Sequence, residues 1–354
     1  MQFGLTETQQ MLKNSAREFF PAECPMAEVR RLMEVEGAYD AKLWSKIAAQ
    51  GWTGIIFDEQ HGGMGLGLVE LAVAAEEMGR ALLPGPYFST VCLAGALLDA
   101  IPEQRAHLRP ICEGRERATV ALMDANGARA ELKGGALSGA KLFVPDACAA
   151  DFTLVVCGDA VARVSRNAPG VSIKPMPSID ATRQLYEVSF AGTPAEILVS
   201  GPPAEAALSR ALDVATLAVC AEMVGGMQRI MEISVEYAKT RKQFGKPIGQ
   251  FQAVQHHCAD MLLLTESSRS AVYYAAWALN EGAPDARTAV SIAKSYANEA
   301  YREVGNKGIQ VHGGMGFTWE NDIHLYYRRA KASEIAFGDT AYHRERIARA
   351  VVDR

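Results

Sequence analysis

Hydrophobic positions recur with helical spacing through the first 110 residues of the chain. Thr6 and Gln9 fit a capping box at the start of the first helix, and Gly51 suits the end of the second. The predicted helical stretches are residues 6–20, 40–50 and 68–81, the last of them amphipathic. The pattern predicts an all-α domain over residues 1–112.

The period changes to alternation between about residue 113 and residue 202. Short stretches of alternating hydrophobic and polar residues are separated by Gly, Asp, Asn and Pro, which is typical of strands joined by turns. The predicted strands are residues 119–122, 141–144, 152–157, 161–164, 171–173, 186–190 and 197–199. Their number and length predict a middle domain that is a small β-sandwich or barrel.

Helical periodicity returns from residue 203 and predicts a C-terminal four-helix bundle over residues 203–354. The predicted long helices are residues 204–240, 250–281, 285–307 and 340–353. The resulting α+β order, helices then strands then helices, argues against the doubly wound sheet of a nicotinamide enzyme. The glycine run at residues 63–67 is not a GxGxxG fingerprint and predicts a turn before the third helix.

Composition narrows the class of protein. The 354 residues carry a formal net charge of -5, which gives no general attraction to nucleic acid or to an anionic membrane. We find no membrane-spanning pattern and no signal-peptide pattern, so we expect a cytoplasmic protein. The seven cysteines form no C-x-x-C pair, which argues against a disulfide framework and a zinc site. We therefore expect no metal and mostly buried cysteines.

Three C-terminal segments carry groups suited to a dinucleotide. They are residues 241–248 (Arg-Lys-Gln-Phe-Gly-Lys-Pro-Ile), residues 251–256 (Phe-Gln-Ala-Val-Gln-His) and residues 310–317 (Gln-Val-His-Gly-Gly-Met-Gly-Phe). The arginine offers a fork of donors that suits a pyrophosphate, and the glutamines add neutral polar groups. The glycines let the backbone approach a ligand closely. The candidate cofactor-binding residues are Arg241, Gln243, Phe244, Gln252, Gln310, Gly313, Gly314 and Gly316.

These motifs, together with Gly51-Trp52, residues 58–65 and residues 76–80, resemble the acyl-CoA dehydrogenase family, and the resemblance covers the whole chain. It implies a flavoprotein that uses FAD to dehydrogenate the α,β bond of an acyl-CoA thioester. It also implies assembly as a dimer or tetramer, with an electron-transferring flavoprotein as electron acceptor. In the family, the positions matching the candidate residues hold the adenosine diphosphate part of the FAD that belongs to a neighbouring subunit.

The resemblance also locates the catalytic base. In the family a glutamate removes the α proton of the acyl-CoA while the β hydride passes to flavin N5. The usual glutamate position matches Phe337, which cannot accept a proton, and the alternative position matches Ala215. Asp339 is the best remaining carboxylate, either as the base or as the cap of the last helix. Asp213 is a weaker candidate base, and we expect Glu222 on a solvated face.

The β domain lacks the residues that would hold the flavin ring. Where the family has a Thr-Glu-Pro…Gly-Ser-Asp segment, residues 122–127 read Leu-Met-Asp-Ala-Asn-Gly, shortened and without hydroxyl groups. Pro145 replaces a flavin-contacting threonine and offers neither a hydroxyl nor an amide donor.

Our main hypothesis is therefore one subunit of a hetero-oligomer, resembling the paired subunits of bacterial steroid and side-chain degradation, whose partner chain supplies the ring pocket and the base. Two alternatives stay open. One is a homo-oligomeric dehydrogenase that uses Asp339, and the other is a non-catalytic acyl-CoA-binding or scaffold subunit.

Overall fold

The computed structural model describes residues 4–352. The chain divides into two compact units. The first contains the chain up to Met26, Leu68–Leu83 and the chain from Thr216 onward, and the second contains Ala27–Gly67 and Pro84–Ala215. Helix α7 (Pro202–Thr240) contributes residues to both. The three-domain division at residues 112 and 202 follows the change of secondary structure and stays a prediction.

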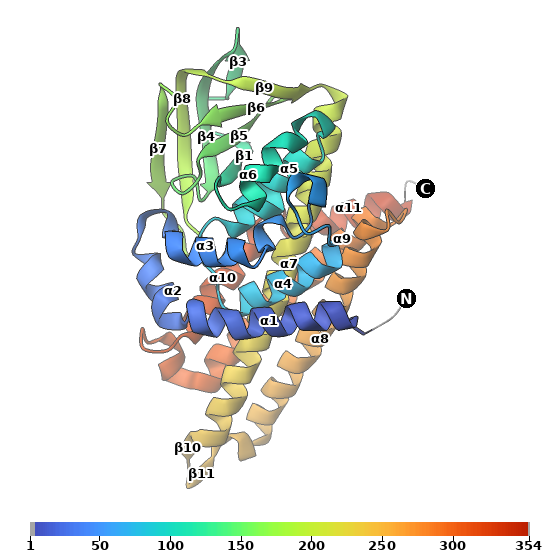
Figure 1. The fold of residues 1–354 in the computed structure, drawn as a ribbon. Helices are drawn as coiled ribbons and strands as arrows, with labels where there is room; N and C mark the ends of the chain where they lie inside the picture. The colour runs from blue at the N-terminus through green and yellow to red at the C-terminus, as the bar shows by residue number, and fades with distance from the viewer. Residues whose placement is uncertain (1–3, 353–354) are drawn as a thin grey trace. The chain divides into compact units, whose positions relative to one another are not determined.

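The first unit is helical (Figure 1). Besides most of α7, it contains α1 (Glu7–Glu23), α4 (Leu68–Arg80), α8 (Gln252–Asn280), α9 (Ala286–His312), α10 (Ile323–Ile335), α11 (Thr340–Val352), the short strands β10 (Lys242–Gln243) and β11 (Lys246–Pro247), and the 3₁₀ turns η6 (Ile248–Gln250) and η7 (Gly313–Phe317). The predicted helices are confirmed, although α9 runs further than residue 307 and α10 was not predicted. The capping box is confirmed too, since Thr6 and Gln9 each accept a hydrogen bond from the other's backbone N–H.

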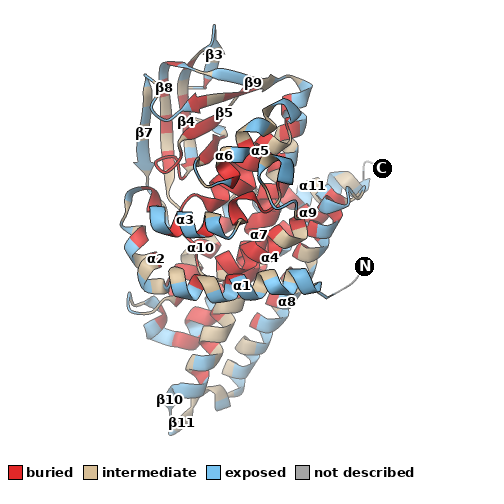
Figure 2. Cartoon of the chain, in the orientation of Figure 1, coloured by how far each residue is buried: buried red, intermediate tan, exposed pale blue. Residues whose placement is uncertain are grey.

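Helix α4 is buried on nearly all sides (Figure 2), so the prediction of an amphipathic helix was wrong. Two carboxylates within it, Glu76 and Glu77, are almost inaccessible to solvent. Glu76 accepts hydrogen bonds from Lys13 Nζ and Tyr273 Oη, both at 3.0 Å. Glu77 binds the Arg17 guanidinium through two hydrogen bonds of 2.7 and 3.1 Å. Because each carboxylate has a cation and a hydrogen-bond partner, α4 tolerates charge inside the core.

The second unit begins with short helices. They are α2 (Met26–Met33), η1 (Glu36–Ala38), α3 (Ala41–Ala49), η2 (Trp52–Gly54), η3 (Glu59–His61), the π-helix η4 (Phe88–Gly95), α5 (Ala96–Asp99), η5 (Pro102–His107) and α6 (Leu108–Cys112). Asp40 caps α3, and Gly51 follows it with a φ of 77°, as predicted for a helix end. The predicted glycine turn is also confirmed. A Cβ at Gly63 would lie 2.0 Å from Phe57 O, so the glycine permits close packing of the turn.

Two sheets complete the second unit, with strand orders β1-β5-β6-β9 and β2-β4-β8-β7, and β3 pairs with β4. Their bounds are β1 (Ala118–Ala121), β2 (Met123–Asp124), β3 (Glu131–Lys133), β4 (Ala136–Pro145), β5 (Phe152–Cys157), β6 (Ala160–Ser165), β7 (Val171–Met176), β8 (Leu185–Pro194) and β9 (Glu196–Ser200). Val155 and Val164 of the first sheet share one buried cluster with Leu137 and Val188 of the second. The two sheets therefore pack face to face, and the predicted sandwich is confirmed.

Candidate functional site

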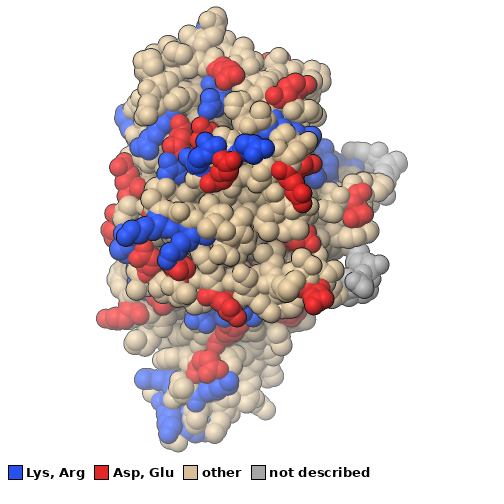
Figure 3. Space-filling model, in the orientation of Figure 1, with Lys and Arg blue, Asp and Glu red and all other residues tan. Residues whose placement is uncertain are grey.

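Residues 241–248 form a β-hairpin that continues from the end of α7. Gln243 pairs with Lys246, and Ile248 N donates to Arg241 O at 2.8 Å to close the base of the hairpin. The side chains of Arg241 and Gln243 are exposed. Lys and Arg gather at the lower end of the molecule in Figure 3, where Figure 1 places β10 and β11. The hairpin therefore presents a basic surface to any anion that binds there.

The tip of the hairpin is a strained two-residue turn. Phe244 and Gly245 have φ values of 52° and 80°, the positive values that a type I′ turn requires. A phenylalanine rarely adopts this conformation. Its ring is 92% exposed and meets the edge of the Phe251 ring at 6.1 Å, and Lys246 Nζ lies 4.4 Å from the centre of that second ring. Gln252, the first residue of α8, is exposed beside this group.

The end of α9 presents the second part of the predicted site. Gln310, Gly313 and Gly314 are exposed, and a Cβ built on either glycine would meet no atom within 4 Å. A ligand can therefore approach this backbone without a steric barrier. Gly316 differs, because it is buried and its Cβ would lie 3.0 Å from Ile309 O. The missing side chain at Gly316 thus allows η7 to pack against α9.

Two aromatic rings that the sequence reasoning missed join the hairpin to the end of α9. The Tyr237 ring on α7 stacks on the His312 ring with 4.5 Å between centroids and 22° between planes. Tyr237 O also accepts a hydrogen bond from Arg241 N at 2.8 Å. His312 Nδ1 lies 2.8 Å from Gly308 O, and burial lowers the pKa of its imidazole. The stack therefore links the backbone of Arg241 to the residue that precedes Gly313.

The turn between α10 and α11 contains the position that matches the family's base. Phe337 occupies it with a φ of 58° and a half-buried side chain. Asp339 is exposed, and its Oδ1 accepts a hydrogen bond from Tyr342 N at 2.8 Å, which is the geometry of a helix N-cap. Ala215 and Asp213 are both buried on α7. The predicted cap at Asp339 is therefore present, whereas its role as a base stays a prediction.

The prediction of a solvated face at Glu222 was wrong. Glu222 is 6% exposed, and its Oε2 lies 3.7 Å from Arg329 NH1, which is itself buried. Helix α7 is buried on all sides in this region, so hydrophobic periodicity does not separate an inner from an outer face there. A buried carboxylate needs a cation, and Arg329 on α10 supplies it.

The residues at the positions that match the family's ring-binding groups make internal contacts in this chain. Asp124 Oδ1 lies 2.7 Å from Lys141 Nζ and accepts a hydrogen bond from Ala130 N at 3.0 Å. Burial alone would raise the pKa of Asp124, but these two hydrogen bonds, together with the positive charges of Lys141 and Arg129, outweigh it and hold the pKa below its usual value. Pro145 O accepts a hydrogen bond from Thr119 Oγ1 at 2.6 Å. This chain's own residues therefore do not fit a flavin ring at segment 122–127 and Pro145.

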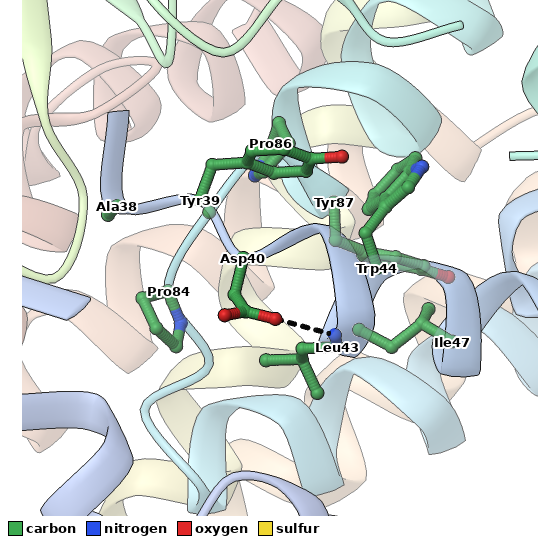
Figure 4. Close-up of a pocket in the computed structure, with 10 residues that line it drawn as sticks. Ala38, Tyr39, Asp40, Leu43, Trp44, Ile47, Pro84, Pro86 and Tyr87 are labelled. Carbon is green, nitrogen blue, oxygen red and sulfur yellow. Dashed lines mark hydrogen bonds between the residues drawn. The ribbon is translucent and has the colours of Figure 1, made fainter. Parts of the chain in front are cut away.

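A small cavity lies between α3 and the segment that follows α4 (Figure 4). Its volume is about 10 Å³, which admits no more than one water molecule. The Asp40 carboxylate beside it accepts hydrogen bonds from Lys42 N and Leu43 N at 2.9 Å and so caps α3. The hydrogen bond from Leu43 N is the largest cause of the lowered pKa of Asp40, and the hydrogen bond from Lys42 N lowers this pKa further. The cavity is too small for an acyl chain, and its carboxylate already has partners.

Within residues 4–352, no group of three or more His, Cys, Asp or Glu side chains is placed to hold a metal ion. All cysteines of the range except Cys258 are buried, which confirms the prediction that most of them are buried. No helix in the described range is both long enough and apolar enough to cross a membrane.

Comparison with known proteins decides the family. Models of the N-terminal and C-terminal domains of acyl-CoA dehydrogenases match residues 6–115 and 205–352. The acyl-CoA dehydrogenase IpdE2 of Mycobacterium tuberculosis is 32% identical over 332 residues, which cover 92% of each chain. The chain belongs to the acyl-CoA dehydrogenase family. It is thus a member of a family of flavoprotein oxidoreductases that act on acyl-CoA thioesters.

Solved structures extend the comparison of this acyl-CoA dehydrogenase. A structure described as the Tcur3481-Tcur3483 steroid ACAD G363A variant superimposes with a TM-score of 0.88 at 31% identity and covers 98% of each chain. The ChsE4-ChsE5 complex from Mycobacterium tuberculosis gives a TM-score of 0.90 at 28% identity, with full coverage of both chains. The predicted order of a helical domain, a β domain and a C-terminal helical domain is therefore that of the family.

Proposed function

We propose that this chain is one subunit of a hetero-oligomeric, FAD-dependent acyl-CoA dehydrogenase. Its hairpin and the end of α9 hold the adenosine diphosphate part of an FAD, and a different partner chain supplies the pocket for the flavin ring and the carboxylate base. The chemistry that FAD would supply when bound is an acceptor for the hydride from the β carbon of the acyl-CoA. In the proposed site, this chain's Arg241 neutralises pyrophosphate charge, and the backbone at Gly313 and Gly314 admits the ligand closely.

The observation that carries the proposal is an asymmetry between two sets of residues. Arg241, Gln243 and the two glycines of α9's end are exposed and open, as a dinucleotide requires. The ring segment is closed by the contact of Asp124 with Lys141, and Phe337 stands at the position of the base. Both facts are explained if this subunit binds only the adenosine diphosphate part of a neighbouring subunit's FAD and does not bind the flavin ring.

Two similar structures support a hetero-oligomer, because ChsE4-ChsE5 and Tcur3481-Tcur3483 each name two different chains. The proposed substrate is an acyl-CoA thioester, and the proposed electron acceptor is an electron-transferring flavoprotein. We also propose a cytoplasmic location.

Flavin stoichiometry tests the proposal. The chain purified alone should retain well below one equivalent of flavin, whereas the complex purified with its partner should hold one FAD per pair of unlike chains. Quantitative flavin absorbance after gel filtration measures both values. A full equivalent of FAD on the isolated chain, together with dehydrogenase activity, would refute the dependence on a partner.

Replacement of Asp339 with Asn separates the proposal from a homo-oligomer that uses this carboxylate. Asparagine caps helices as well as aspartate does, so the variant should keep its stability. We expect turnover by the purified complex to stay within about two-fold of the wild type, because the proposed base lies in the partner. An Asp339→Ala control should instead lose about 1 kcal/mol of stability with the cap. Loss of activity in the asparagine variant would make Asp339 the base.

A further inference from the structure

The two parts of the proposed dinucleotide site come from segments that are distant in sequence. The hairpin follows α7, and the glycines follow α9. A pyrophosphate that is bound by both needs them in a fixed relative position, because a shift of about 1 Å weakens a charge-assisted contact. A contact that can set this position is the ring stack of Tyr237 and His312, which lies within the first unit.

Burial of His312 and backbone hydrogen bonds hold the two stacked rings in place. His312 is 3% exposed, and the 2.8 Å contact of its Nδ1 with Gly308 O favours the tautomer that carries the proton on Nδ1. The Tyr237 ring lies nearly parallel to it, and the carbonyl of Tyr237 receives the amide of Arg241. One residue thus holds the start of the hairpin by its backbone and the end of α9 by its ring.

The base of the hairpin is fixed by one further hydrogen bond and by close backbone packing. Gln255 Nε2 donates to Gly249 O at 2.9 Å, and a Cβ at Gly249 would lie 3.0 Å from Ala238 O. The turn η6 is therefore packed closely on the last part of α7, next to Tyr237 in sequence. With the hairpin tied to α7 in this way, the ring stack links this end of α7 to the end of α9.

We propose that Tyr237 and His312 are positioning residues for the cofactor: their stacked rings hold Arg241 of the hairpin in register with Gly313 and Gly314 at the end of α9. The inference rests on the proposed function. Neither ring needs to touch the dinucleotide, and neither takes part in the chemistry.

The test uses the chain in complex with its partner and measures the dissociation constant of FAD by fluorescence after reconstitution of the apo complex. An aromatic pair is worth up to about 1.5 kcal/mol, so Tyr237→Ala should weaken FAD binding by roughly ten-fold. Tyr237→Phe keeps the ring and should retain the wild-type affinity for FAD. Tyr274 provides a matched control, because its ring also lies against an aromatic partner, Trp277. It stands about 33 Å along α8 from Gln252, so Tyr274→Ala should leave affinity unchanged.

Arg241→Gln in the same assay separates failure of the inference from failure of the proposed function. If Arg241→Gln weakens FAD binding and Tyr237→Ala does not, the positioning role is wrong and the site stands. If neither variant changes FAD binding, the proposed site is wrong. A merely structural role for Tyr237 predicts that the alanine variant lowers the melting temperature of the apo complex while its FAD affinity stays at the wild-type value, and this outcome would also overturn the inference.

Discussion

Replacing Gly225 with alanine should abolish most of the folded protein. Gly225 lies on α7 where it crosses α4, and an added Cβ would sit 1.7 Å from Glu76 O and 2.7 Å from Arg80 N. Both are backbone atoms, so no rotation of a side chain relieves the overlap. The helices would have to separate and expose the buried Glu76 and Glu77. We expect a loss of more than about 4 kcal/mol, against a total stability of roughly 5–15 kcal/mol for a typical protein.

Soluble yield and urea unfolding at neutral pH measure this effect. Gly314→Ala is the matched control, because its Cβ would meet no atom within 4 Å and its backbone does not require a positive φ. The control should change the free energy of unfolding by no more than about 0.5 kcal/mol. A Gly225→Ala protein as stable as the control would mean that α4 and α7 do not cross in contact.

The same crossing of α4 and α7 explains why residue 79, within the motif at residues 76–80, is a glycine. A Cβ at Gly79 would lie 2.0 Å from Glu222 O, so a glycine on each helix faces the backbone of the other. Residues 76–80 resembled a family motif, but nothing in their spacing indicated that Gly79 faces α7. A residue's need to be glycine comes here from a contact between helices distant in sequence, and local patterns do not contain that contact.

Strands could be predicted where a short run of mostly apolar residues lies between turn residues. The strands β5 and β6 are such runs of six residues, and their predicted bounds agree with the structure to within one residue. The strands β2 and β3 contain two and three residues, too few for any period to appear. Helix α10 was missed for a different reason. It buries polar side chains such as Arg329 and His324, so its inner face does not read as hydrophobic.

The residues of the candidate site could also be predicted only in part. Arg241 and Gly313 could be found from the sequence because their chemistry is local to a short motif. The stacking of Tyr237 on His312 could not, since either ring alone reads as an ordinary core side chain. Phe337 at the position of the family's base indicates that a proton acceptor is missing there, but no pattern in the sequence indicates the buried lysine behind the turn that contains it.

That lysine is Lys294 on α9, which is inaccessible to solvent. Its Nζ contacts Asn298 Oδ1 at 2.6 Å, and three backbone carbonyl oxygens also lie within reach. Ser333 O at 2.9 Å and Glu334 O at 3.3 Å belong to the last turn of α10, and Gly338 O at 3.1 Å belongs to the turn that leads to α11. These contacts hold the turn next to Phe337 against α9.

Replacement of Lys294 with methionine should therefore destabilise the chain by about 3–5 kcal/mol, because buried carbonyl oxygens lose their donor. Urea unfolding at pH 7 measures the loss. Lys307→Met on the same helix is the control, because Lys307 pairs with the half-exposed Asp260 at 2.9 Å near the surface. Such a pair contributes no more than about 1 kcal/mol. Equal losses in the two variants would show that Lys294 has no special role in holding the turn.

The pH dependence of the stability of the wild type and of Lys294→Met tests the burial of the ammonium group. Burial lowers the pKa of Lys294 from 10.5 to about 8, so between these values the unfolded chain binds more protons than the folded chain. The free energy of unfolding then rises with pH across this window, and the contribution of Lys294 is complete above pH 10.5. The difference in stability between wild type and Lys294→Met should therefore grow by up to about 3 kcal/mol from pH 8 to pH 10.5. A difference that shrinks over this range would show that the native turn favours the charged lysine, and that its carbonyl oxygens outweigh the cost of burial.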